Sequence, residues 1–200
     1  MFTGIVAAVG RIVSLAPLAR GVRLTIDGGG LSLADTRLGD SICVNGACLT
    51  AVELAPGAFV ADVSRETLDC TVGLDQAGAE VNLEKSLTLA DRLGGHLVSG
   101  HVDGVGLVSR FEPVGESWLL EIAAPDELAR YIARKGSVTV NGVSLTVNHV
   151  RGARFDINII PHTRAVTTFR NLATGQRVNL EVDLIARYCE RLLSSAGEDV

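Results

Sequence analysis

Two ten-residue segments carry the side chains best suited to nucleophilic chemistry. SICVNGACLT spans residues 41–50 and SVTVNGVSLT spans residues 137–146, so Cys48 in the first segment corresponds to Ser144 in the second. A thiol and a hydroxyl are both small polar groups that donate hydrogen bonds and, once activated, attack electrophiles. The repetition favours two similar pockets with different chemistry. The alternative is that Cys48 is a small buried hydrophobic residue, the usual role of an isolated cysteine in a strand.

Two of the four histidines lie in GGHLVSGHVDG, residues 94–104. His96, His101 and Asp103 are candidate metal ligands, but a zinc site draws further ligands at matching spacing from elsewhere in the chain. His149 and His162 have no neighbouring ligand pair, so the sequence predicts no metal site. The glycines of this segment relax the backbone and indicate a junction between two units.

The elements that position these residues belong to an internal repeat. A shift of 96 residues aligns Asn45-Gly46 with Asn141-Gly142, and VNLE at 81–84 matches VNLE at 178–181 after one inserted residue. Within a copy, as in RFDINII at 154–160, hydrophobic and polar residues alternate with the period of half-buried strands. Turn signals between these runs favour short antiparallel strands that close a small barrel in each copy. We expect two such domains, residues 1–96 and 97–183.

Helical segments are few. Pro125 and the acidic residues after it predict a short helix that runs through Tyr131. Residues 184–200 form a third unit, because hydrophobic residues recur there at helical spacing after the second barrel is complete; they are Leu184, Ile185, Tyr188, Leu192 and Leu193. This apolar stripe either packs on its own barrel or meets copies of itself in an oligomer, and spacing alone does not choose between the two.

Composition excludes several classes of protein. A net charge of -5 and an aromatic content of 4% disfavour nucleic-acid binding, which needs basic patches or stacking platforms. No apolar run approaches the roughly 18 residues of a membrane-spanning helix, and the start lacks a signal-peptide pattern. The four cysteines show no C-x-x-C pair and indicate reduced thiols. We therefore expect a soluble cytoplasmic protein without a membrane or nucleic-acid partner.

Five blocks of sequence together resemble the riboflavin synthase family of the alpha-chain type over essentially the whole chain. They are MFTGIV at the start, NGACLT at 45–50, GGHLVSGHVDG at 94–104, KGSVTVNGVSLTV at 135–147 and IIPHT at 159–163. The resemblance implies an all-β fold with minor α content. It consists of two tandem six-stranded antiparallel Greek-key β-barrels and a C-terminal α-helix that assembles a homotrimer.

The resemblance also implies an activity. Each barrel would bind one 6,7-dimethyl-8-ribityllumazine, and the active site would form where the first barrel of one subunit faces the second barrel of another. Transfer of a four-carbon unit between the two lumazines would yield riboflavin and 5-amino-6-(ribitylamino)pyrimidinedione, without a metal or organic cofactor. A duplicated domain suits a reaction between two identical molecules, because holding both in register is a large part of the rate enhancement.

Site residues carried over from the family fall into three groups. Catalytic roles are implied for Ser41, Cys48 and His101. A first lumazine site is implied for Gly4, Ile5, Val6, Leu49, Thr50, Asp62, Val63, Ser64, Arg65, Glu66 and Thr67, and a substrate-binding role is implied for Phe2, which matches the N-terminal phenylalanine of the family. A second lumazine site is implied for Gly100, Val102, Lys135, Ser144, Leu145, Thr146, Ile160, Pro161, His162, Thr163 and Asp183.

Two points remain open in the sequence. Asn141 stands where many members of the family carry aspartate, which removes an ionised group from the second barrel. The alternative function is a lumazine- or flavin-binding carrier that keeps the fold without catalysis. The sequence is equally silent on an association with lumazine synthase and on which barrel holds the donor molecule.

Overall fold

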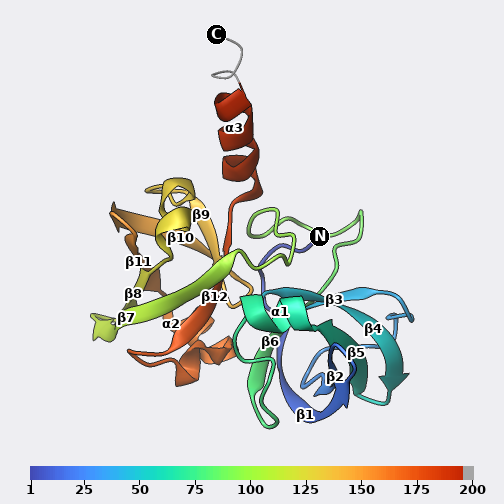
Figure 1. Ribbon diagram of the computed structural model, residues 1–200. Helices are drawn as coiled ribbons and strands as arrows, with labels where there is room; N and C mark the ends of the chain where they lie inside the picture. The colour runs from blue at the N-terminus through green and yellow to red at the C-terminus, as the bar shows by residue number, and fades with distance from the viewer. Residues whose placement is uncertain (196–200) are drawn as a thin grey trace.

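The computed structural model describes residues 1–195 and consists of two closed antiparallel barrels with a helix at one end (Figure 1). The first barrel has the spatial order β1-β2-β5-β4-β3-β6. Its strands are β1 (Ala8–Leu18), β2 (Gly21–Asp27), β3 (Ser41–Val44), β4 (Ala47–Ala55), β5 (Ala58–Ser64) and β6 (Glu80–Lys85), and the helix α1 (Arg65–Cys70) follows β5.

The second barrel repeats this arrangement in the order β10-β11-β8-β7-β12-β9. Its strands are β7 (Gly104–Val114), β8 (Ser117–Ala123), β9 (Ser137–Val140), β10 (Val143–Arg151), β11 (Arg154–Ile159) and β12 (Arg177–Val182). Helical segments are the 3-10 helices η1 (Asp126–Tyr131) and η2 (Thr168–Asn171) and the α-helix α2 (Pro161–Val166). The expected pair of six-stranded antiparallel barrels is confirmed, and η1 lies where a short helix was predicted.

Each barrel has its own hydrophobic core. The inward residues of the strands fill the interior, and the largest side chains occupy corresponding positions, with Phe59 in the first core and Phe155 in the second. Closure of each barrel removes the unpaired strand edges that an open sheet would expose. The alternation read from the sequence therefore sets which side chains point outward, where a ligand can reach them.

The two barrels meet through their Asn-Gly turns. Asn45 and Asn141 adopt left-handed φ values of 50° and 48°, as two-residue hairpin turns require. The amide of Asn82 donates to the carbonyl of Asn141 at 2.9 Å, and the amide of Asn179 donates to the carbonyl of Asn45 at 2.8 Å. Asn141 also accepts a bond from the backbone of Asn179 through Oδ1 at 2.8 Å. Asn141 thus has a structural role between the barrels.

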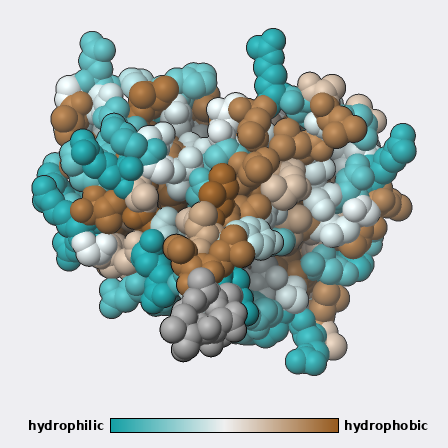
Figure 2. All heavy atoms as spheres, turned by 90° about the horizontal axis from the view of Figure 1, so that it is seen from above, coloured by the Kyte–Doolittle hydropathy of each residue, from teal (hydrophilic) through white to brown (hydrophobic). Residues whose placement is uncertain are grey.

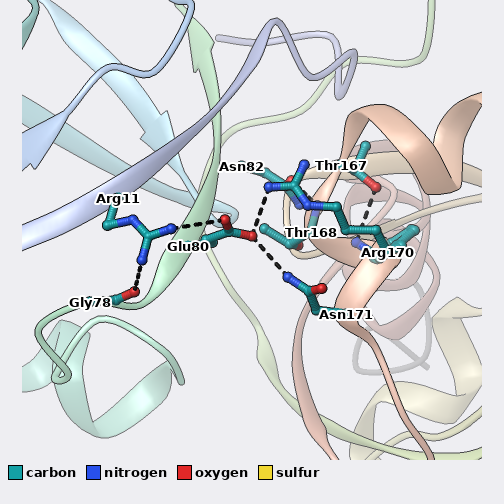
Figure 3. Close-up of polar contacts among 9 residues, drawn as sticks. Arg11, Gly78, Glu80, Asn82, Thr167, Thr168, Arg170 and Asn171 are labelled. Atoms are coloured by element: carbon teal, nitrogen blue, oxygen red, sulfur yellow. Dashed lines mark hydrogen bonds and ion pairs between the residues drawn. The ribbon is translucent and has the colours of Figure 1, made fainter.

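Charged residues extend this contact at its rim (Figure 3). Glu80 on β6 accepts bonds from Arg170 at 2.8 Å and from Asn171 at 2.9 Å, both on η2 of the other barrel. The other carboxylate oxygen of Glu80 faces Arg11 at 3.2 Å. These bonds fix the relative orientation of the two barrels.

The helix α3 (Leu184–Ser195) projects away from both barrels (Figure 1). Two ion pairs connect the helix to the second domain, one between Arg187 and Asp103 and one between Glu190 and Arg130. The apolar stripe remains exposed, with 65% of Ile185 and 72% of Leu192 accessible, so packing on its own barrel is not the arrangement observed. Figure 2 shows hydrophobic side chains gathered on the face from which the helix projects. In the described part of the chain, every helix is too short or too polar to cross a bilayer.

Candidate functional site

Two segments that precede the barrels run antiparallel to each other between them. The backbone of Phe2 bonds to that of Val98 in both directions, at 2.7 Å and 3.0 Å, and the amide of His96 donates to the carbonyl of Thr3 at 3.1 Å. Phe2 is fully buried against Val98 and Cys43. Its side chain therefore supports the paired segments from within, and a direct contact with a ligand remains a prediction.

A buried carboxylate anchors each segment. Glu84 on β6 accepts bonds from the amides of Thr3 and Gly4 at 2.7 Å and 2.9 Å. Glu181, its counterpart on β12, accepts from the amides of Ser99 and Gly100 at 2.6 Å and 3.0 Å. Burial raises the pKa of both carboxyls, and that of Glu181 reaches about 7. The segments are thus held by charge-assisted bonds at equivalent places in the two barrels.

Beyond these anchors each segment crosses to the opposite barrel. The carbonyl of Gly4 accepts from the amide of Ser144 at 2.7 Å, and the carbonyl of Gly100 accepts from the amide of Cys48 at 2.7 Å. Left-handed φ values of 75° and 78° allow both contacts. A Cβ on Gly4 would lie 2.6 Å from that of Ser144, and one on Gly100 would lie 2.7 Å from that of Cys48. Glycine is therefore required at both crossings.

The crossing places the two segments against barrels other than those expected from the sequence. Gly4, Ile5 and Val6 were assigned to the first site, yet Gly4 bonds to the second barrel and Val6 packs on the second core. Gly100 and Val102 were assigned to the second site, yet they lie against Cys48 and the first core. The physical reason is that the neighbouring strands leave the amides of Ser144 on β10 and Cys48 on β4 unpaired, and the glycine carbonyls accept from them.

Cys48 and His101 line one cavity of about 270 Å³ beside the first barrel. The cavity is lined by Ala47, Cys48, Glu66, Thr67, Cys70, Thr71, Gly100, His101 and Val102. Ser64 caps α1 by accepting the amide of Thr67 at 3.1 Å, and this bond fixes the start of the helix against the cavity. The structure thus brings a thiol, an imidazole and hydroxyl groups together, a set suited to nucleophilic and proton-transfer steps.

Other expected residues of the first site are arranged differently. Ser41 lines a separate cavity of about 580 Å³, together with Glu84 and Lys85, and does not line the cavity of Cys48. Leu49 and Val63 point into the barrel core, which leaves only their backbone for a ligand. Outward-facing members remain accessible; they are Thr50, Asp62, Arg65 and Glu66. Asp62 is held by Arg23 through two bonds of 2.7 Å and 2.9 Å, and Arg65 pairs with Asp69.

The second barrel carries a different polar centre at Ser144. Its hydroxyl lies 2.7 Å from Nδ1 of His96, whose Nε2 lies 3.4 Å from the hydroxyl of Thr139. His96 is only 9% exposed, and this burial lowers its pKa. The lowered pKa favours the neutral imidazole, which shares a hydrogen bond with the hydroxyl of Ser144. Sequence reasoning considered His96 only as a metal ligand and missed this contact, for which the preceding Gly94-Gly95 was the available signal.

The remaining expected residues of the second site lie in several elements of the second domain. Lys135 adopts a left-handed φ of 65°, where the first copy has Gly39 at 91°. Ile160, Pro161, His162 and Thr163 form the start of α2, and Thr146 faces outward from β10. Leu145 packs against the second core. Asp183 accepts the amide of Ile185 at 3.0 Å and so caps α3.

A sequence profile of the lumazine binding domain matches the chain twice, over residues 3–86 and 99–183. Riboflavin synthase of Photobacterium phosphoreum is 46% identical over 96% of this chain and 89% of its own length. Riboflavin synthase of Mycobacterium tuberculosis is 47% identical over 98% of this chain and all of its own length. The chain belongs to the riboflavin synthase family. Cys48 lies in the first of its lumazine-binding domains and Ser144 in the second.

Solved structures with the same fold include the protein LumP. LumP complexed with riboflavin superimposes with a TM-score of 0.83 at 25% identity, over 91% of this chain and 99% of LumP. LumP complexed with 6,7-dimethyl-8-(1'-D-ribityl) lumazine gives a TM-score of 0.81 at 24% identity, over the same shares of the two chains. The second comparison bears on the fold alone.

Proposed function

We propose that this member of the riboflavin synthase family catalyses the dismutation of two molecules of 6,7-dimethyl-8-ribityllumazine. A four-carbon unit passes from one lumazine to the other, and the products are riboflavin and 5-amino-6-(ribitylamino)pyrimidinedione. One observation carries the proposal: a single scaffold presents Cys48 with His101 beside the first barrel and Ser144 with His96 beside the second. Two similar binding sites with unequal chemistry suit a reaction in which identical molecules play unequal parts.

The reaction needs proton removal from a methyl group, nucleophilic addition to a ring and return of a proton. A thiol and an imidazole that line one cavity are groups of the right kind for these steps. We assign catalytic roles to Ser41, Cys48 and His101, and binding roles to the residues that surround the two centres. In this proposal Ser41 acts from the cavity that it lines together with Glu84 and Lys85.

The active site is completed by a second subunit in this proposal. The cavity of Cys48 is formed by the first barrel and the segment at 100–102 and includes no strand of the second barrel. A homotrimer joined by α3 would bring the first domain of one subunit to the second domain of the next. The exposed residues Ile185, Tyr188, Leu192 and Leu193 would supply the apolar contacts between the helices. We place the enzyme in the cytoplasm and the domain boundaries at 96/97 and 183/184.

Incubation of the purified protein with 6,7-dimethyl-8-ribityllumazine tests the proposal. We expect the absorbance and fluorescence of riboflavin to develop, with one pyrimidinedione formed for each riboflavin. Ligand binding without turnover would identify a carrier protein instead and would overturn the proposal. The identity of 40–47% to several riboflavin synthases, compared with 25% to LumP, supports the enzyme over the carrier.

A further inference from the structure

Cys43 and Cys48 lie directly opposite each other in the hairpin of β3 and β4. The register pairs Cys43 with Cys48 and Val44 with Ala47 across the turn Asn45-Gly46. Residues that face each other in an antiparallel pair project their side chains to the same side of the sheet. Both thiols therefore lie on the outer face of the first barrel, where they form one cluster with Phe2 and Val98.

The hydrogen-bond pattern places this pair in the closer of the two antiparallel spacings. In a two-residue hairpin the residues that flank the turn, here Val44 and Ala47, form the hydrogen-bonded pair, and the next pair is not hydrogen-bonded. The amide of Cys48 is accordingly free of β3 and donates to the carbonyl of Gly100 at 2.7 Å. The Cα atoms of such a pair are about 4.5 Å apart, within the range of roughly 4.4–6.8 Å that a disulfide spans.

The two thiols differ in access. Cys43 is 2% exposed, and burial raises its pKa, so it is a protonated thiol shielded from solvent. Cys48 is half-buried and lines the cavity of about 270 Å³ that opens to solvent. A small oxidant therefore reaches Cys48 first, and Cys43 is the neighbouring thiol that can resolve the product.

The second domain lacks this chemistry at the same positions. Thr139 and Ser144 form the corresponding cross-strand pair, and both hydroxyls contact the imidazole of His96. A disulfide is therefore restricted to the first domain. The same cross-strand position therefore carries a pair of thiols in the first domain and a pair of hydroxyls in the second.

We propose that Cys43 and Cys48 form a reversible regulatory disulfide in response to hydroperoxides. In the first step the sulfur of Cys48 is oxidised to a sulfenic acid, while the O–O bond of hydrogen peroxide is reduced and water leaves. In the second step the sulfur of Cys43 attacks that of Cys48, the S–S bond forms, and a second water carries away the hydroxyl group and the thiol proton. Loss of the Cys48 thiol then stops turnover, a consequence that rests on the proposed function.

Mass spectrometry of the full-length protein after limited hydrogen peroxide treatment tests the disulfide independently of activity. We expect the mass to fall by two hydrogen atoms and a Cys43–Cys48 linked peptide to appear, with a thiol reductant restoring both the mass and riboflavin formation. Oxygen addition at Cys48 without a linked peptide would overturn the proposal. A linked peptide with unchanged turnover would refute the regulatory role and the catalytic role of Cys48, while leaving the disulfide established.

The variant Cys43→Ala is the matched control. It keeps Cys48 and its cavity but removes the resolving thiol. We expect peroxide to add oxygen to Cys48 in this variant, with inactivation that a thiol reductant no longer reverses once the sulfinic acid forms. Cys189, which is exposed and does not line the cavity of Cys48, serves as an internal reference for reagent access. Reductant-reversible inactivation in Cys43→Ala equal to that of the unmodified protein would contradict Cys43 as the resolving residue.

Discussion

Nδ1 of His96 lies 2.7 Å from the hydroxyl oxygen of Ser144, although the two residues are separated by 48 positions in the chain. His96 belongs to the segment that joins the two barrels, whereas Ser144 belongs to β10. The contact gives the second domain a hydroxyl beside a neutral imidazole, and the first domain has Cys48 at the corresponding position. The different chemistry of the two pockets thus depends on a linker residue as well as on the exchange of cysteine for serine.

Replacement of His96 by glutamine should lower kcat by roughly 10- to 100-fold, because the hydroxyl of Ser144 loses its proton acceptor. KM should change much less. Since burial lowers the pKa of His96, the imidazole remains neutral until the pH falls below its ordinary range, and the acid limb of kcat should be altered in the variant. Steady-state kinetics across pH checks this. An unchanged pH profile would show that His96 has only a structural role.

Replacement of Cys48 by serine should depress turnover far more than lumazine affinity, by about 100-fold in kcat, because a hydroxyl is a much weaker nucleophile than a thiolate. Ligand affinity measured by fluorescence titration should stay close to that of the unmodified protein. The reciprocal variant Ser144→Cys tests whether the two positions are interchangeable. Equal turnover in Cys48→Ser would reduce Cys48 to a packing residue.

Stability should depend on pH through Glu181. Burial raises the pKa of this carboxyl from 4.5 to about 7 in the folded protein. Its contribution is therefore fully present below about pH 4.5 and is lost as the pH rises through about 7, by up to about 3 kcal/mol. Urea unfolding at several pH values should show this decline in the unmodified protein and a smaller one in Glu181→Gln. If the free energy of unfolding depended on pH in the same way in both proteins, the raised pKa of Glu181 would be refuted.

Substitutions of Lys135 should separate the cost of its backbone conformation from the contribution of its side chain to ligand binding. Its φ of 65° lies in the left-handed region, which costs a residue with a side chain about 1 kcal/mol. Lys135→Gly should therefore keep or slightly raise stability, because glycine adopts a left-handed φ at the corresponding position 39 of the first copy, but weaken lumazine binding. Lys135→Ala retains the strain and removes the charge. If both variants bind and turn over lumazine normally, the lysine has no role in the second pocket.

The exposed stripe of α3 should control assembly. Leu192→Asp in the full chain should yield monomers with intact barrels, because a charge cannot be buried in an apolar contact without a large penalty. Light scattering gives the mass, and lumazine binding with little turnover is expected. Ser194→Asp, which adds the same charge at a position whose hydroxyl bonds within the helix, is the control. A fully active Leu192→Asp monomer would contradict the shared active site.

The fold was largely predictable from the sequence because its signals are local. The alternation in RFDINII reports which face of a strand is buried, and the Asn-Gly pairs report tight hairpins, since both depend on neighbouring residues only. Repetition then relates one copy to the other, and the repeat alone is enough to align Cys48 with Ser144. The stripe on α3 was equally visible, but whether a barrel covers it is a property of the folded chain.

Only the tertiary structure decided which barrel each connecting segment contacts. The repeat shows that Gly4 and Gly100 occupy equivalent positions. They would be equally equivalent if each glycine contacted only the barrel that follows it in the chain. The outcome depends on Glu84 and Glu181, which hold the segments between the barrels, and on the amides of Cys48 and Ser144, which donate to the carbonyls of Gly100 and Gly4. The two carboxylates bond to glycines 80 and 81 positions away in the chain. The free energies of such contacts depend on three-dimensional proximity, which the order of residues does not record.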